Sequence, residues 1–558
     1  MPEADRTSVR LRRARPWIVL IVATLLFVLV ALYRFDALGG AFGGFDNDHF
    51  LHFAYAKQVQ AGEQPLRDFQ DAGLQGARPS LTYELSAAAQ RYFGNNLRSE
   101  AWLTVGGVAL GAAVTVVAAS QIAPWPLALL MALLSALISP KLYGYPKVLV
   151  LSVASLVIVR YAARPSWTYL VVMSAWTAIA FLFRHDYAVY CGVGFGAVIA
   201  ASHWTSWREG ARRAVVYGVV TVALLAPSML WVYEYRGLAE YFRNGLAMSR
   251  REGLRTDMDW PRPTLQGVSS VSSAFEPEQN TEAGLYYLFL AMPLAAIVVA
   301  WSRWRRHHLD PDGHVAALLS LGIMTALLSH YFLRGSLEGR FGDMAAPVAV
   351  IGAGLLGISL ARGASSIGRR TLRASAALAV LAFAAACIWS LQQVGAELRT
   401  TRLLQSPGDQ TRRISEELAS LPVALRESQA TTRMEAADYL HRCTRPTDRV
   451  FVVGYEPELF VFAERLFAAG RATVIPEFYA DERYSREAIA GLESQSVPIV
   501  LAEPETFYAT FPALLAYLRT RYAEHGTVRV NEVGSLRVLV RKDASGRPTG
   551  PRGLPCFG

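Results

Sequence analysis

Two carboxylates and two imidazoles lie close together near the N-terminus, in the stretch FDNDHFLHF. The side chains are those of Asp46, Asp48, His49 and His52, and they follow a hydrophobic run that is long enough to cross a membrane. A carboxylate removes a proton near neutral pH most effectively when it is partly desolvated and held by neighbouring groups. The boundary between lipid and water supplies a low dielectric constant on one side and solvent on the other. These residues are therefore candidates for a general base.

The segment that follows predicts an amphipathic helix at the membrane surface. In HFLHFAYAKQVQAG, apolar and aromatic residues are frequent but do not form a run long enough to span a membrane, and Gly62 ends the pattern. With Asp46 or Asn47 as the N-cap, Asp48 falls in the first turn, where the helix dipole favours a negative charge. The alternative is that Asp46 and Asp48 only cap this helix.

The composition indicates an integral membrane protein. Of the 558 residues, 53% are hydrophobic and 18% are charged, whereas soluble domains carry about a quarter charged residues. The net charge of +10 would suit nucleic acid, but the arginines cluster in short segments between apolar runs. Charges that set membrane orientation are distributed in this way. We therefore expect a lipid bilayer, and no nucleic acid, as a partner.

About eleven apolar runs are long enough to be membrane spans, since a span needs roughly 20 residues. The first could instead be a signal peptide, but its length and the many runs that follow favour an uncleaved span. Several runs are short, so that one weak pair could form a re-entrant hairpin. The predicted spans cover residues 17–33, 101–119, 124–139, 147–162, 167–183, 187–203, 214–232, 285–301, 315–333, 345–361 and 374–391.

The arginine-rich segments between these runs all fall on one side of the predicted membrane, which by the positive-inside rule is the cytoplasm. This predicts a cytoplasmic N-terminus at residues 1–16 and a multi-pass transmembrane domain at 17–391, in a plasma membrane or bacterial inner membrane. Two long loops, 34–100 and 233–284, and a C-terminal domain at 392–558 are then expected on the outer side.

The C-terminal part has the pattern of a small α/β domain. RVFVVGYEPELFVFAERLFAAGRATVIPEF predicts a strand, a turn at Gly454, a helix and a second strand. VPIVLAEP and LRVLVRK predict further strands, and FPALLAYLRTRYAEHG predicts a helix that ends at Gly526. A disulfide between Cys443 and Cys556 is conceivable, but sequence alone does not pair them.

The order of motifs over residues 40–100 resembles the lipid-linked sugar transferases of the GT-C superfamily, in the branch of protein O-mannosyltransferases and aminoarabinose transferases. Those enzymes show an acidic pair after the first span, an Ala-rich helix ending in Gly, a Pro-Tyr-x-Asp turn, then Lys-Pro-Pro-Leu-x-Tyr and Phe-Gly. The corresponding stretches here are DHFLHFAYAKQVQAG (48–62), PLRDF (65–69), RPSLTY (78–83) and YFG (92–94). The resemblance is looser over the remaining spans and returns at DRVFVVGYEPELFVFAERLFAAG.

The resemblance implies a fold and a reaction. The fold is a membrane all-α, GT-C-type helical bundle with interfacial helices and a small outer α/β domain. The reaction moves a hexosyl or pentosyl group from a polyprenyl-phosphate donor to a hydroxyl of a glycan, lipid or protein acceptor at the outer face, and it requires no cofactor.

The matching motifs also imply roles for individual residues. Asp48 stands at the position of the catalytic base, with Asp46 as the alternative, and Arg78 stands at that of the basic residue that contacts the donor phosphate. Asp68 matches the turn aspartate and Tyr83 the motif tyrosine, both in supporting roles. His49 departs from the family pattern because a second acidic residue is usual there.

Further cations on the predicted outer side could stabilise the charge that develops on the donor phosphate. Lys147 opens the fourth span, although a long side chain there could simply extend toward the lipid headgroups. Arg184, His185 and Asp186 in FRHD join two spans directly and form either a buried polar network or a solvated turn. Arg340 follows the flexible stretch GSLEG.

Three alternatives stay open on the sequence. Asp46, Asp48 and His49 could bind a divalent metal ion, but a monophosphate donor needs none if arginines supply the positive charge. A transporter or flippase of a lipid-linked or polar substrate would place ionisable residues near the membrane midplane, in paired halves that this sequence does not show. A receptor with an outer sensing domain would have little need for the ordered Asp and Arg pattern.

Overall fold

The computed structural model describes residues 16–39, 45, 47–70, 81–138, 141–253, 261–264, 278–307, 313–333, 338–360, 406–420, 434–476, 482–530, 534–547 and 549–557, with isolated positions between 374 and 388. The chain divides into two compact units. The helical unit comprises Met1–Ala37, Thr104–Pro227 and Arg251–Pro407. The mixed unit comprises Leu38–Leu103, Ser228–Arg250 and Gly408–Gly558. Each unit is described by itself.

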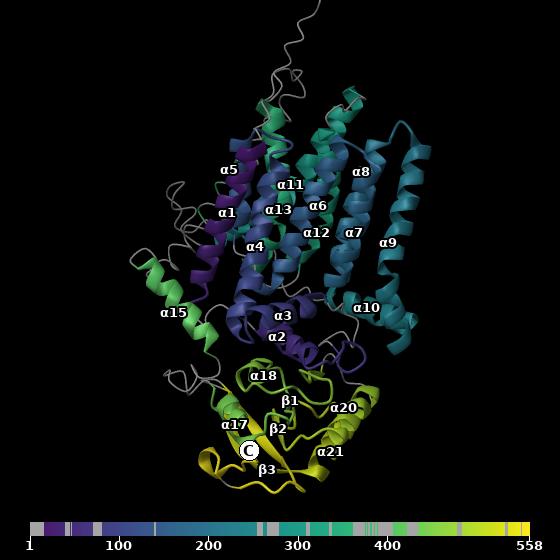
Figure 1. The fold of residues 1–558 in the computed structure, drawn as a ribbon. Coiled ribbons are helices and arrows are strands. Elements are labelled where there is room, and N and C mark those ends of the chain that lie inside the picture. The colour runs from purple at the N-terminus through teal and green to yellow at the C-terminus, as the bar shows by residue number, and fades with distance from the viewer. Residues whose placement is uncertain are drawn as a thin grey trace, which may run out of the picture. The chain divides into compact units, whose positions relative to one another are not determined.

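The helical unit is a bundle of long apolar helices (Figure 1). Its helices are α1 (Pro16–Ala37), α4 (Leu97–Ala119), α5 (Trp125–Leu137), α6 (Tyr145–Ala163), α7 (Trp167–Phe183), α8 (His185–Ser202), α9 (Trp207–Tyr235), α11 (Glu278–His307), α12 (His314–Leu328) and α13 (Glu338–Leu360). Two short 3₁₀ helices, η1 (Leu142–Gly144) and η3 (Ser329–Leu333), adjoin α6 and α12. The start of α4 and the end of α9 belong to the mixed unit.

The helix positions confirm the predicted membrane fold. Ten of the eleven predicted spans coincide with helices, and the last one, 374–391, lies mostly outside the described residues. Within the described chain, seven helices are long and apolar enough to cross a membrane. The apolar stretch of α13 is entirely buried, whereas only 6% of that of α9 is buried. Apolar residues such as Val215, Val219 and Val222 on the exposed face of α9 suit contact with lipid.

Glycines allow the central helices to approach closely. A Cβ atom at Gly107 of α4 would lie 2.4 Å from the Tyr145 ring of α6, and one at Gly352 of α13 would lie 2.3 Å from the Cε atom of Met131 in α5. Helices packed in a membrane gain their stability from such close backbone approach, because lipid and side chains are equally apolar. A larger residue at Gly107 would displace the Tyr145 side chain, and one at Gly352 would displace the flexible end of the Met131 side chain.

The mixed unit combines helices with a four-stranded sheet. The strands are β1 (Phe451–Val453), β2 (Ile499–Ala502), β3 (Tyr522–Arg529) and β4 (Ser535–Arg541), in the order β1-β2-β4-β3. β1 and β2 are parallel with Val452 opposite Leu501, and the other pairs are antiparallel. The remaining elements are α2 (Asn47–Gln60), α3 (Leu81–Phe93), α10 (Leu238–Gly253), α15 (Pro407–Ala419), α17 (Glu435–Cys443), α18 (Glu458–Phe462), α20 (Glu482–Ser494), α21 (Pro512–Arg521) and the 3₁₀ helix η5 (Pro551–Gly553).

Two predictions for this part were wrong. In the stretch RATVIPEF, the described residues 471–476 form no regular strand, and Arg471 makes only an isolated bridge with Gln70. The helix expected to end at Gly526 ends at Arg521, and β3 begins at the next residue. Tyr522 is buried, and its hydroxyl donates a hydrogen bond to the Val497 carbonyl at 3.0 Å. Burial and pairing with β4 therefore override the local helical pattern.

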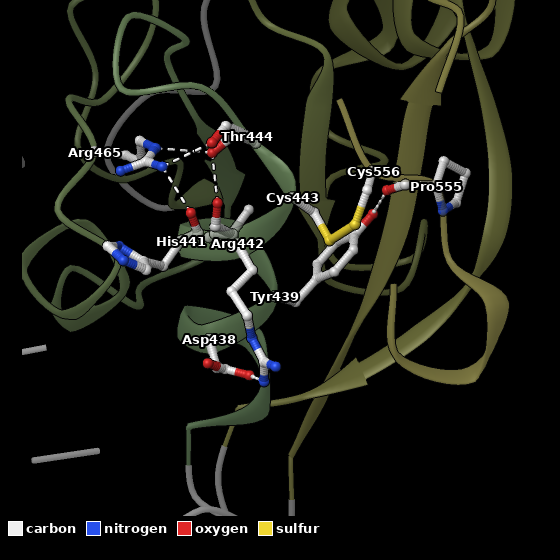
Figure 2. The surroundings of a disulfide bond; sticks show 10 residues. Asp438, Tyr439, His441, Arg442, Cys443, Thr444, Arg465, Pro555 and Cys556 are labelled. Atoms are coloured by element: carbon white, nitrogen blue, oxygen red, sulfur yellow. Dashed lines mark hydrogen bonds and ion pairs between the residues drawn. A yellow bond between two sulfur atoms is a disulfide. The ribbon is translucent and has the colours of Figure 1, made fainter. Parts of the chain in front are cut away.

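A disulfide joins Cys443 at the end of α17 to Cys556 near the C-terminus, which resolves the pairing that the sequence left open (Figure 2). The Tyr439 hydroxyl donates to the Pro555 carbonyl at 2.8 Å, and the Phe557 amide donates to the Cys443 carbonyl at 2.8 Å. These bonds fix the last residues of the chain to α17.

Replacing Cys443 and Cys556 together by serine should destabilise the mixed unit by about 2–5 kcal/mol, because the unfolded chain loses a cross-link. Thermal unfolding of the full chain in lipid nanodiscs, with and without reductant, measures this. Reductant should lower the melting temperature of the wild type and leave the double variant unchanged. If alkylation of the denatured wild type without reductant finds four reactive thiols, the bond does not form.

Candidate functional site

Helix α2 places Asp48 as the sequence predicted. The helix begins at Asn47, so that Asp48 lies in its first turn, and it ends at Gln60, two residues before Gly62. Asp48 is half-buried, and the Tyr455 hydroxyl donates a hydrogen bond of 2.5 Å to its Oδ1 atom. Asp46 lies outside the described residues. A half-buried carboxylate at a helix N-terminus, held by a phenol, has the surroundings that a general base requires.

His49, the neighbour of Asp48, belongs to a buried polar network. Its Nε2 atom lies 3.3 Å from Oε1 of Glu100, and the Ser86 hydroxyl donates to the other oxygen of that carboxylate. The Gln90 amide donates to Ser86 at 3.2 Å, and Gln60 donates to Gln90 at 3.0 Å. The network connects both ends of α2 to α3 and to the start of α4. His49 therefore holds α2 in place.

The sequence left open a divalent metal site at Asp46, Asp48 and His49, of which Asp46 lies outside the described residues. In the part of the chain that the structure describes, no three His, Cys, Asp or Glu side chains gather as metal ligands would. His52 instead lies against Tyr83, with ring centroids 5.9 Å apart.

Tyr83 and Asp68 support the segment around α2. Tyr83 is buried, and its ring centroid lies 4.9 Å from that of Tyr55 on α2. The Asp68 carboxylate accepts hydrogen bonds from the Arg67 side chain and from the backbone N–H of Gln64. The Arg67 guanidinium holds the pKa of Asp68 below its usual range. Asp68 thus closes the turn after α2. Arg78 lies outside the described residues, so its predicted phosphate contact stays a prediction.

A second group of predicted residues meets in the helical unit. Lys147 at the start of α6 is buried and forms an ion pair with Asp343 of α13. Its ammonium group lies 4.0 Å from the ring centroid of Tyr331. Arg340 lies one turn before Asp343, with its guanidinium 3.8 Å from the same carboxylate. Because Lys147 is buried and paired, extension toward lipid headgroups does not describe it.

The FRHD residues join this group through the same tyrosine. Arg184 lies between α7 and α8 and binds Asp186 in bidentate fashion, with both N–O distances at 2.9 Å. The Tyr331 hydroxyl donates to Asp186 as well. His185 packs on Phe181, with ring centroids 4.5 Å apart. The sequence alternatives of a buried network and a solvated turn both hold in part, since Arg184 and Asp186 are connected and partly exposed.

We call Lys147, Arg184, Arg340, Asp186, Asp343 and Tyr331 the cation cluster. Its three cations face two carboxylates, which leaves one positive charge in excess. The side chains of Arg184 and Arg340 are 33% and 26% exposed, whereas that of Lys147 is 4% exposed. The arginines are therefore the members that an anionic ligand can reach.

Three carboxylates lie close together after the ends of the parallel strands β1 and β2, those of Glu456, Glu458 and Glu503. Burial, followed by the hydrogen bond and charge of Glu458, raises the pKa of Glu456 to about 8. Burial, together with the charge of Glu456, raises the pKa of Glu503.

The comparisons with known proteins bear on the fold. No family model matches the chain, and no curated protein matches it by sequence. Among solved structures, ArnT from Cupriavidus metallidurans bound to undecaprenyl phosphate has a TM-score of 0.50 at 14% identity, and the match covers 94% of this chain and 98% of that chain. The Archaeoglobus fulgidus oligosaccharyltransferase in complex with zinc and sulfate has a TM-score of 0.43 at 13% identity, covering 92% and 75%.

The chain has the GT-C fold. The ArnT match extends over nearly the whole of both chains, so the GT-C fold includes the mixed unit as well as the helix bundle. This confirms the fold that the motifs of residues 40–100 implied.

Four residues of this GT-C chain escaped the sequence analysis. Asp343 and Tyr331 stand in RFGD and SHYF, and Tyr455 stands in GYEPE, where nothing marks a functional tyrosine or aspartate. Glu100 starts an apolar run, and an acidic residue in such a position was the one available signal.

The raised pKa of Glu456 predicts a pH-dependent stability. The folded state binds a proton that the unfolded state releases near pH 4.5, so this stabilisation is complete below pH 4.5 and is lost as the pH rises through about 8. The melting temperature should fall by about 3 °C between pH 5.5 and 8.5, and Glu456→Gln should reduce this fall. Glu482→Gln, at an exposed position, is the control. Equal slopes for both variants would contradict the assignment.

Proposed function

We propose that this protein is an integral-membrane glycosyltransferase that moves a sugar from a polyprenyl-phosphate donor to an acceptor hydroxyl at the outer membrane face. The observation that carries the proposal is the likeness over nearly the whole chain to a GT-C structure that holds undecaprenyl phosphate. The positions of Asp48 and of the cation cluster support it, because they supply a base and accessible arginines.

The reaction follows from these groups. Asp48 accepts the proton of the acceptor hydroxyl while the hydroxyl oxygen attacks the anomeric carbon of the donor. The bond between that carbon and the phosphate oxygen breaks, and the lipid phosphate leaves with the bonding electron pair. The phosphodiester starts with one negative charge and the leaving monoester carries two, so negative charge develops on the phosphate oxygens.

Arginines are suited to stabilise this charge, since a guanidinium binds two phosphate oxygens at once. We assign this role to Arg340 and Arg184 together with Arg78. Lys147 is paired with Asp343 and buried, so we assign it to the support of Arg340 through their shared carboxylate. No step in this scheme requires a metal ion or another cofactor.

We propose the membrane topology that the sequence predicts. Residues 17–391 form the membrane domain, and residues 392–558 lie on the outer side. The Cys443–Cys556 disulfide supports this placement, because disulfides persist in the periplasm and outside the cell and are rare in the cytosol.

Asp48→Asn should abolish sugar transfer and leave folding intact, because an amide cannot accept the hydroxyl proton. The assay follows the release of undecaprenyl phosphate from undecaprenyl-phosphate sugars by the purified protein in lipid, and the rate should fall by about 100-fold or more. Asp409→Asn is the matched control, since Asp409 occupies the first turn of α15 and is exposed. Wild-type activity of Asp48→Asn would transfer the role to Asp46, which Asp46→Asn tests in the same assay.

Arg340→Gln and Arg78→Ala should each weaken donor binding more than acceptor binding. Loss of one charge-assisted contact to phosphate costs about 1.5–3 kcal/mol, or roughly a tenfold or larger rise in KM for the donor. Arg213→Gln, which alters an arginine paired with Glu209 elsewhere in the helical unit, is the control. Equal losses for donor and acceptor would argue against a phosphate contact.

A further inference from the structure

We propose that Tyr455 is a positioning residue for Asp48, so that the C-terminal α/β part of the chain completes the site of transfer. This inference rests on the proposed function. Its central observation is the hydrogen bond from the Tyr455 hydroxyl to the Asp48 carboxylate, which joins residues 407 positions apart in the sequence. Both residues belong to the mixed unit.

The backbone that carries Tyr455 is fixed by the sheet. Tyr455 follows β1 by two residues, and the Glu503 amide donates to the Val453 carbonyl at 2.9 Å just before it. The Val474 amide donates to the Gly454 carbonyl at 3.1 Å. The backbone from which the Tyr455 side chain extends is therefore fixed at the end of a buried strand.

Helix α2 is bound to the same α/β part along its length. Near Asp48, the Phe50 ring lies 5.1 Å from the Phe462 ring of α18. Further along, the Gln58 amide donates to the Phe467 carbonyl at 3.0 Å. After the end of the helix, Glu63 forms an ion pair with Arg449. These contacts fix the position of α2 relative to the segment that carries Tyr455.

The start of α2 is also held by the His49–Glu100 pair, one residue from Asp48. The backbone of Asp48 is therefore fixed by these contacts, and Tyr455 fixes the orientation of its carboxylate. A phenol suits this task because it stays protonated near neutral pH and donates a strong bond to an anion. Small losses of alignment at a reacting group reduce rates strongly.

The test removes the Tyr455 hydroxyl, which donates the hydrogen bond to Asp48, and keeps the aromatic ring. Tyr455→Phe should lower kcat for undecaprenyl phosphate release by about 10–100-fold and leave both KM values within about twofold, since no substrate contact is lost. Tyr484→Phe is the matched control, because it removes a buried tyrosine hydroxyl that bonds the Thr473 carbonyl in the same unit. In the Asp48→Asn background, Tyr455→Phe should cause no further loss. Wild-type kcat for Tyr455→Phe, or equal losses in both Phe variants, would overturn the inference.

A second measurement needs no substrate. The melting temperatures of wild type, Asp48→Asn, Tyr455→Phe and the double variant form a cycle, measured on the full chain in nanodiscs. A departure from additivity of about 1–2 °C is expected if the two side chains interact. Because asparagine keeps an oxygen that could accept the same bond, the cycle is repeated with Asp48→Ala, and additive shifts there would reject the inference at any level of activity. If the wild type transfers no sugar from any donor while the coupling persists, the proposed function fails and the contact stands.

Discussion

A charged group is stable inside an apolar helix bundle only when an opposite charge lies beside it, because an isolated buried ion is strongly destabilising. Lys147 and Asp343 meet this requirement where α6 and α13 begin. Tyr331 extends the pair, since its ring lies over the ammonium group and its hydroxyl binds Asp186. Arg184 and Arg340 are held by the same carboxylates but keep part of their surface exposed. The exposed positive charges of Arg184 and Arg340 thus depend on the buried Lys147–Asp343 pair, which has no net charge.

The same constraint shapes the mixed unit. His49 and Glu100 are both buried, and the hydrogen bonds of Ser86, Gln90 and Gln60 extend the network from α4 to α3 and the end of α2. Contacts between buried polar groups hold the helices that carry them in a defined arrangement. Here they hold α2 and with it the half-buried Asp48. His49 thus contributes to holding the helix that carries Asp48.

The C-terminal sheet and the elements around it contact α2, the helix that carries Asp48. Its strand β1 leads to Tyr455, and the elements around it contact α2 at Phe50 and the turn after α2 at Glu63. The segments Leu38–Leu103 and Gly408–Gly558 thus belong to one compact unit. The proposed base, Asp48, thus lies on a short helix, and its hydrogen-bond partner Tyr455 lies at the end of a sheet strand in the same unit.

The sequence by itself determined the features that depend on local patterns. Hydropathy predicted ten helices of the bundle, because a helix in a membrane is apolar both where it faces lipid and where it packs on other helices. The position of Asp48 before a run ending at Gly62 predicted α2. The motifs of residues 40–100 also implied the GT-C fold. Local patterns failed where burial decided the outcome, as at Tyr522, which begins a strand although its neighbours favour a helix.

Only the tertiary structure decided which side chains meet. Lys147 and Asp343 are 196 residues apart, Asp48 and Tyr455 are 407 apart, and Cys443 and Cys556 are 113 apart. The reason is physical: a residue's own sequence neighbourhood sets its helix, strand and membrane preferences. Its partner is set by how whole elements pack, and charges and hydroxyls select one another only after that packing has brought them together.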